Sequence, residues 1–73
     1  MTLHEAPVGT MARVAASPRT PVHQRLATLG LREGIAVHVM RRTSGGGRLL
    51  GIGPSRLAVD RATLQALRVE PVQ

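Results

Sequence analysis

Residues 20–42 read TPVHQRLATLGLREGIAVHVMRR, and they decide the fold because they hold a helix, its stop signal and a strand in succession. Thr20 is a favoured N-cap residue, and Pro21 suits the first helical position, where its missing N–H leaves no bond unmade. Gly30 ends the helix where a left-handed backbone is wanted, and Leu31 can fold back as the hydrophobic contact of that cap. The stretch therefore predicts a short helix, a tight reversal and a strand.

The helix and the strand each have one apolar side. Val22, Leu26 and Leu29 are four and three residues apart, which predicts one helix face packed on the core. Residues 35–42 alternate between an apolar set and a mixed set, which predicts a strand with one face inward. The inward set is Ile35, Val37 and Val39, and the outward set is Ala36, His38 and Met40.

Shorter elements are expected on both sides of this stretch. A strand with Ala12, Val14 and Ala16 on one face precedes it, and a Gly-rich connection follows over residues 43–47. The remaining elements are strands over 48–53, 56–59 and 67–70 and a helical turn over 61–66 that begins at Asp60. Together they predict a mainly β protein: a small, strongly bent barrel of about five strands, with one short helix between the first two strands and a helical turn before the last.

Length and composition limit the protein to a small domain. The 73 residues predict a single domain over 1–73, with a thin core built without any aromatic side chain. The lack of cysteine excludes disulfides and thiolate metal sites and favours the cytoplasm. Met1 to Gly9 does not resemble a signal peptide, and no apolar run approaches the ~20 residues that span a bilayer. We therefore expect a soluble, cytoplasmic chain without membrane insertion.

The charge pattern leaves two interpretations open. The chain carries ten arginines, no lysine and a net charge of +6. This balance reflects either a coding bias toward arginine or an anionic partner, such as nucleic acid, the inner membrane surface or an acidic protein. Small barrels that bind nucleic acid usually stack bases on aromatic side chains, which this chain lacks. Nucleic-acid binding through arginine–phosphate contacts therefore stands as an alternative function and not as the leading one.

The chain offers no convincing catalytic group. The four carboxylates are expected to be solvated or to cap helices, and the serines lie in turns. The run Gly45 to Gly47 is followed by Arg48 and a strand, whereas a phosphate loop needs Lys-Ser/Thr and a helix. These observations predict a binding module that is not an enzyme.

Three histidines are the candidate metal ligands. His4, His23 and His38 are dispersed, and no pair has the spacing that places two ligands on one turn of helix or one strand face. Surface histidines are commoner than ligands. A small metal-binding protein is thus a further alternative, in which these three side chains would have to converge in space.

Residues 25–34, RLATLGLREG, have the pattern R-L-x-x-L-G-L-x-x-G, and an alternating strand ending in basic residues follows over 37–42. This combination resembles the ferrous iron transport protein A family, FeoA. Residues 56–60, RLAVD, resemble the next strand of the family. The chain has Pro7-Val8-Gly9 where the family commonly has Pro-Gly, which affects only the turn. The resemblance implies an SH3-like barrel.

The resemblance also implies a function. Members of the family are small cytoplasmic partners of FeoB, the GTP-dependent membrane transporter of ferrous iron, and the same domain type resembles the C-terminal domain of metal-dependent repressors. We therefore expect an accessory protein that binds the cytoplasmic part of a FeoB-type transporter and modulates uptake, held at the inner membrane surface through that partner. A metal-binding module related to the repressor domain is the alternative.

Contact residues, cofactors and assembly follow as expectations. No cofactor is certain, and the implied metal is Fe(II) or another divalent transition metal. Short edge strands also allow dimers or trimers. The partner-binding side chains are expected on the outward face of the helix and around the central hairpin: His23, Arg25, Met40, Arg42 and Arg48.

Overall fold

The computed structural model describes residues 1–15 and 20–72 and contains one antiparallel sheet with strand order β4-β3-β2-β1-β5. The predicted order of elements is confirmed, with one helix between the first two strands and a helical turn before the last. In chain order the elements are the 3-10 turn η1 (Leu3–Glu5), β1 (Met11–Val14), α1 (Pro21–Thr28), β2 (Ala36–Arg42), the 3-10 turn η2 (Ser44–Gly46), β3 (Arg48–Ile52), β4 (Ser55–Val59), α2 (Arg61–Ala66) and β5 (Val69–Pro71).

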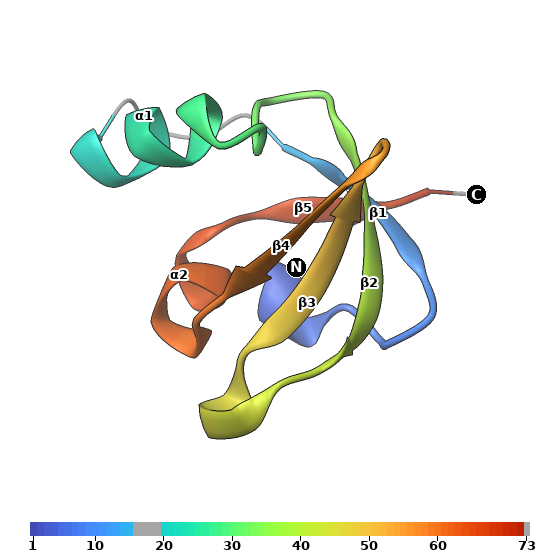
Figure 1. The fold of residues 1–73 in the computed structure, drawn as a ribbon. Helices are drawn as coiled ribbons and strands as arrows, with labels where there is room; N and C mark the ends of the chain where they lie inside the picture. Colours follow the sequence, from blue (N-terminus) through green and yellow to red (C-terminus); the bar gives the residue numbers. More distant parts are fainter. Residues whose placement is uncertain (16–19, 73) are drawn as a thin grey trace.

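The sheet is strongly curved. In Figure 1, α1 lies beyond one end of the strands, while α2 and the N-terminal turn η1 lie next to each other. The β2–β3 pairing shifts register between Val39 and Arg41, which places a bulge at Met40. A bulge increases local twist and bends the strand, so β2 can pair with β3 and β1 while the sheet curls over its core. Within the described residues, no helix is long and apolar enough to cross a bilayer.

The core lies on the concave side of the sheet and consists of aliphatic side chains. Val37 and Val39 are fully buried, as the alternation in β2 predicts, and they meet side chains from η1, α2 and the strands. The buried set is Leu3, Ala6, Ala12, Val14, Leu26, Leu31, Val37, Val39, Leu50, Val59, Leu64, Leu67 and Val69. Ile35 was expected in this set, but it precedes β2 and is 37% exposed. Its N–H bonds to Arg32 O, so it belongs to the reversal after α1.

Both ends of α1 are fixed as predicted. Thr20 Oγ1 accepts the backbone N–H of His23, and Pro21 occupies the first turn. At the other end, Gly30 has φ +104°, and the N–H groups of Gly30 and Leu31 bond back to Ala27 O and Leu26 O. This pattern is a Schellman motif, which ends a helix and reverses the chain.

Two expected positions on α1 differ or lie outside the described residues. Leu29 was expected on the packed face, but it is the C-cap residue and is 52% exposed. The reversal at Gly30 carries the chain back onto the core through Leu31, which leaves Leu29 beyond it. The side chain of Val22 lies outside the described part of the structure, as does Ala16.

Arg48 is buried, which contradicts its expected place on the surface. Only 9% of it is exposed, and Nη1 donates to the carbonyls of Gly46 and Gly47 at 3.0 and 2.9 Å. Its Nε is buried without a hydrogen-bond partner. The residue lies on the same strand face as Leu50, so its stem packs inward and its charge is met by carbonyl dipoles of the preceding turn. Arg48 therefore holds the hairpin in place and is not available to a partner.

Candidate functional site

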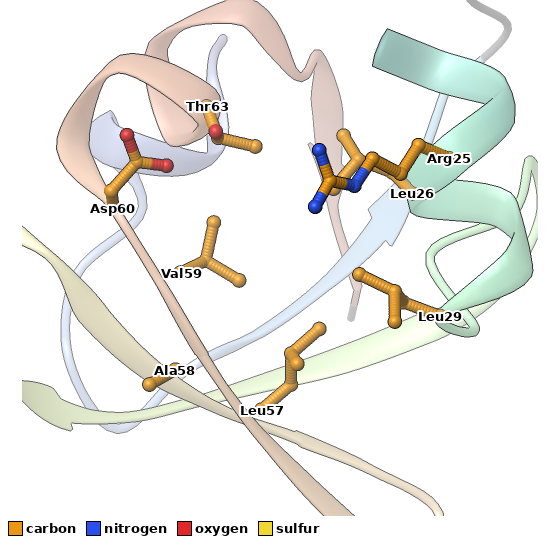
Figure 2. Close-up of a pocket in the computed structure, with 8 residues that line it drawn as sticks. All are labelled: Arg25, Leu26, Leu29, Leu57, Ala58, Val59, Asp60 and Thr63. Carbon is orange, nitrogen blue, oxygen red and sulfur yellow. The ribbon is translucent and has the colours of Figure 1, made fainter. Parts of the chain in front are cut away.

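A groove of about 440 Å³ lies between α1 and the segment that runs from β4 into α2 (Figure 2). Its two walls come from segments more than 25 residues apart, so only the folded chain forms it. The lining residues are Arg25, Leu26, Leu29, Leu57, Ala58, Val59, Asp60 and Thr63.

The floor of the groove is apolar. Leu26 and Val59 are buried and join the groove to the core, whereas Leu57 is half-buried and Leu29 is exposed. Figure 2 shows the side chains of Leu29 and Leu57 on adjacent sides of the opening. Because Leu29 is the C-cap residue of α1, the cap keeps about half of its side chain exposed to solvent. This exposed apolar surface is available for another molecule to cover.

The rim of the groove is polar and carries both signs of charge. Figure 2 shows the Arg25 guanidinium reaching across from α1, with Asp60 and Thr63 on the facing side. Among the residues that the structure describes, neither Arg25 nor Asp60 forms an ion pair or a side-chain hydrogen bond, and Asp60 precedes α2 without capping it. An apolar centre with a polar rim is the usual composition of a protein–protein interface.

The five expected contact residues do not form one surface. Arg25 lines the groove, and Arg42 is exposed at the end of β2. His23 is half-buried, with its Nδ1 2.5 Å from Thr20 Oγ1, so its ring is part of the helix cap. Met40 lies over the outer face of the sheet, in a different groove, and Arg48 is buried.

The groove residues that sequence reasoning missed are Leu29, Leu57, Asp60 and Thr63. Leu29 was assigned to the core from its spacing, and Asp60 was assigned as the start of the helical turn. One local signal was present for Leu29, because it directly precedes the glycine that stops the helix. Its exposure still depends on how far the core extends, which periodicity does not report.

The histidines do not form a metal site of the expected kind. His4 lies in η1, His23 in α1 and His38 on the outer face of β2. Over residues 1–15 and 20–72, no group of three or more His, Cys, Asp or Glu side chains is placed to hold a metal ion. Fe(II), a borderline ion, is usually held by groups of imidazole nitrogens and carboxylate oxygens, so the described residues do not fit a resident iron centre.

One carboxylate has a clearly shifted pKa. The backbone N–H of Thr2 donates to Glu5 Oε1 at 2.7 Å, and this bond holds the pKa of Glu5 below its ordinary value. The residue is exposed and closes the turn η1 against Thr2. The shift therefore reflects a structural cap at the N-terminus.

Comparisons with known proteins agree on one family. The family described as FeoA domain matches residues 1–71. The FeoA protein of Chlorobium tepidum superimposes with a TM-score of 0.87 at 27% identity, over 100% of this chain and 71% of that one. FeoA of Stenotrophomonas maltophilia, solved with zinc and described as an SH3 domain protein, gives a TM-score of 0.77 at 28% identity, over 96% and 89% of the two chains.

A metal-dependent regulator shares the fold alone. The transcriptional regulator MtsR gives a TM-score of 0.85 at 15% identity, over 99% of this chain and 36% of the regulator. No curated protein is similar enough to this chain to count as a match. The expected SH3-like fold is confirmed by these structures.

Proposed function

This chain belongs to the FeoA domain family, and we propose that it docks through the α1–β4 groove on the cytoplasmic part of a FeoB-type transporter and modulates its activity. The family associates the chain with ferrous iron transport as a non-enzymatic accessory domain, in agreement with the scattered carboxylates of the sequence. The Stenotrophomonas relative is described as a candidate activating factor of ferrous iron transport, which supports a modulating role.

The observation that carries the proposal is the exposure of Leu29 beside the half-buried Leu57. The Schellman motif fixes Leu29 at the mouth of the groove, so its apolar surface does not need to be ordered when a partner arrives. Completing its burial against an apolar partner side chain is worth on the order of 1 kcal/mol. Rigid apolar anchors at the centre of an interface are where binding energy concentrates.

The rim defines the chemistry of the docking segment. The docking segment should insert an apolar side chain into the groove. Next to it, an acidic or carbonyl group would pair with Arg25, and a hydrogen-bond donor or a basic group would pair with Asp60. The net charge of +6 would speed association with an acidic protein surface next to the anionic inner leaflet. The proposed location is therefore the cytoplasmic side of the inner membrane, reached through the transporter.

Calorimetric titration of the chain into the transporter, held in lipid nanodiscs and freed of nucleic acid, tests the assignment. Leu29→Ser and Arg25→Glu should each weaken binding by about tenfold or more, because one removes the anchor and the other reverses the rim charge. Met11→Ser and Arg41→Glu are matched controls, since both change exposed residues of the sheet outside the groove. Equal losses in test and control variants, or no binding at any salt concentration, would overturn the proposal.

A further inference from the structure

A second groove, of about 380 Å³, lies on the outer face of the sheet. Two of the three methionines of the chain line it, whereas none of the described residues that line the first groove contains a sulfur atom. Its lining residues are Met11, Ala36, His38, Met40, Gly51, Gly53, Pro54, Ser55 and Arg56. The α1–β4 docking site shares none of these residues, so an account of this groove is independent of the proposed function.

Strand register places two of the potential ligands side by side. Met11 on β1 pairs with His38 on β2, His38 pairs with Gly51 on β3, and Gly51 pairs with Arg56 on β4. Directly opposite residues project from the same face with Cβ atoms about 4.5–5.5 Å apart. The thioether of Met11 and the imidazole of His38 are therefore neighbours on the outer face, and both are exposed.

Met40 joins them through the bulge in β2. A Cβ atom at position 51 would lie 3.3 Å from Met40 Sδ and 3.5 Å from His38 Cβ. The sulfur of Met40 and the Cβ atom of His38 thus both border the space above Gly51, where the cross-strand row has no side chain. Any larger residue at this position would press on the thioether, so the glycine keeps this space open.

We propose that Met11, His38 and Met40 form a binding site for Cu(I), a soft monovalent ion. Two thioether sulfurs and one imidazole nitrogen are the neutral, polarisable ligands that Cu(I) prefers, whereas Fe(II) and Zn(II) favour sites with more nitrogen, carboxylate or thiolate ligands. Among residues 1–15 and 20–72 no group of three or more His, Cys, Asp or Glu side chains is placed to hold a metal ion, whereas this groove brings two methionines and a histidine together.

Arg56 adds selectivity for ion charge. It ends the same cross-strand row and lines the groove, and the three proposed ligands are neutral when they bind a metal. The Coulomb repulsion between its guanidinium and a bound ion is twice as large for a divalent ion as for a monovalent one. The site therefore disfavours Zn(II) and Fe(II) both by ligand softness and by charge.

Titration with Ag(I), a soft monovalent ion that does not change oxidation state in water, tests the site on the full chain. The methionine methyl groups are observed by NMR, and calorimetry gives the stoichiometry. One equivalent of Ag(I) should shift the methyl signals of Met11 and Met40 and leave that of Met1 in place. Met1 is a matched internal control, because it and Met11 are each 42% exposed.

Variants identify the ligands. Met11→Leu, His38→Gln and Met40→Leu should each weaken Ag(I) binding by about tenfold or more, and Met1→Leu and His4→Gln should leave it unchanged. All five positions lie outside the buried core, and circular dichroism verifies that each variant is folded. Competition for Cu(I) against a coloured chelator should give the same ranking. Equal shifts of all three methyls, unchanged affinity in the ligand variants, or Zn(II) binding as tight as Ag(I) would overturn the proposal.

Discussion

The backbone N–H of Leu31 donates to the carbonyl of Leu26 across 2.9 Å, and the side chains of both leucines are buried. This bond turns the chain back onto the core immediately after α1, and it leaves Leu29, between the two, half exposed where it lines the groove. The same local motif therefore stabilises the helix and exposes the apolar residue at the mouth of the docking groove.

Replacing Leu26 with alanine should lower the free energy of unfolding by about 2–5 kcal/mol, because it leaves a cavity under α1. The matched variant Leu29→Ala should change it by no more than about 0.5 kcal/mol, since that side chain is half exposed. Denaturant unfolding followed by circular dichroism measures both. A Leu26→Ala variant as stable as the parent chain would contradict the packing of α1.

Gly30→Ala should destabilise the chain by about 1 kcal/mol or more through its backbone alone. The residue has φ +104°, and an added Cβ would meet Ile52 Cγ2 at an ordinary contact distance of 3.7 Å. The expected loss is thus conformational strain and not crowding. If thermal melting shows no loss of stability, the cap does not fix the reversal as described.

Arg48→Glu should unfold the protein or destabilise it by about 3 kcal/mol or more, because it places a carboxylate beside the carbonyls of Gly46 and Gly47 in a buried position. Arg42→Glu, an exposed neighbour across the hairpin, should stay within about 0.5 kcal/mol of the parent chain. Urea titration separates the two variants. If both variants were equally stable, the burial of Arg48 against the carbonyls of Gly46 and Gly47 would be contradicted.

Stability should fall in acid partly through Glu5. Its pKa is lowered in the folded state, so its contribution is fully present above the ordinary pKa of glutamate and is lost as the pH falls through the lower folded value. Glu5→Gln should flatten the dependence of the unfolding free energy on pH below about pH 4 and leave it unaltered near neutrality apart from a constant offset. A variant with the acid dependence of the parent chain would exclude this contribution.

The sequence predicts those parts of the fold that local chemistry determines. Thr20, Gly30 and Leu31 carry cap signals that act within one turn of helix, and Val37 and Val39 lie inward because strand alternation is local. The candidate site is different, because residues 25–29 and 57–63 meet only in the folded chain. Of the five expected contact residues, Arg25 alone lines this groove.

Two errors show which physical information a sequence lacks. Leu29 has the spacing of a core residue, but spacing does not say where the core ends. Arg48 was expected on the surface as an outward residue beside the central hairpin, yet it is buried and the carbonyls of its own hairpin turn accept its hydrogen bonds. Both outcomes depend on tertiary packing and not on residue type.

The most direct test of the central claim is an NMR titration of the isotopically labelled chain with the FeoB-type transporter in nanodiscs. The account predicts that backbone amide signals of residues 25–29 and 57–63 shift or broaden first, while those of Met11 and His38 on the outer face of the sheet remain unchanged. Perturbations concentrated on the outer face, with α1 and β4 unaffected, would contradict docking through the α1–β4 groove.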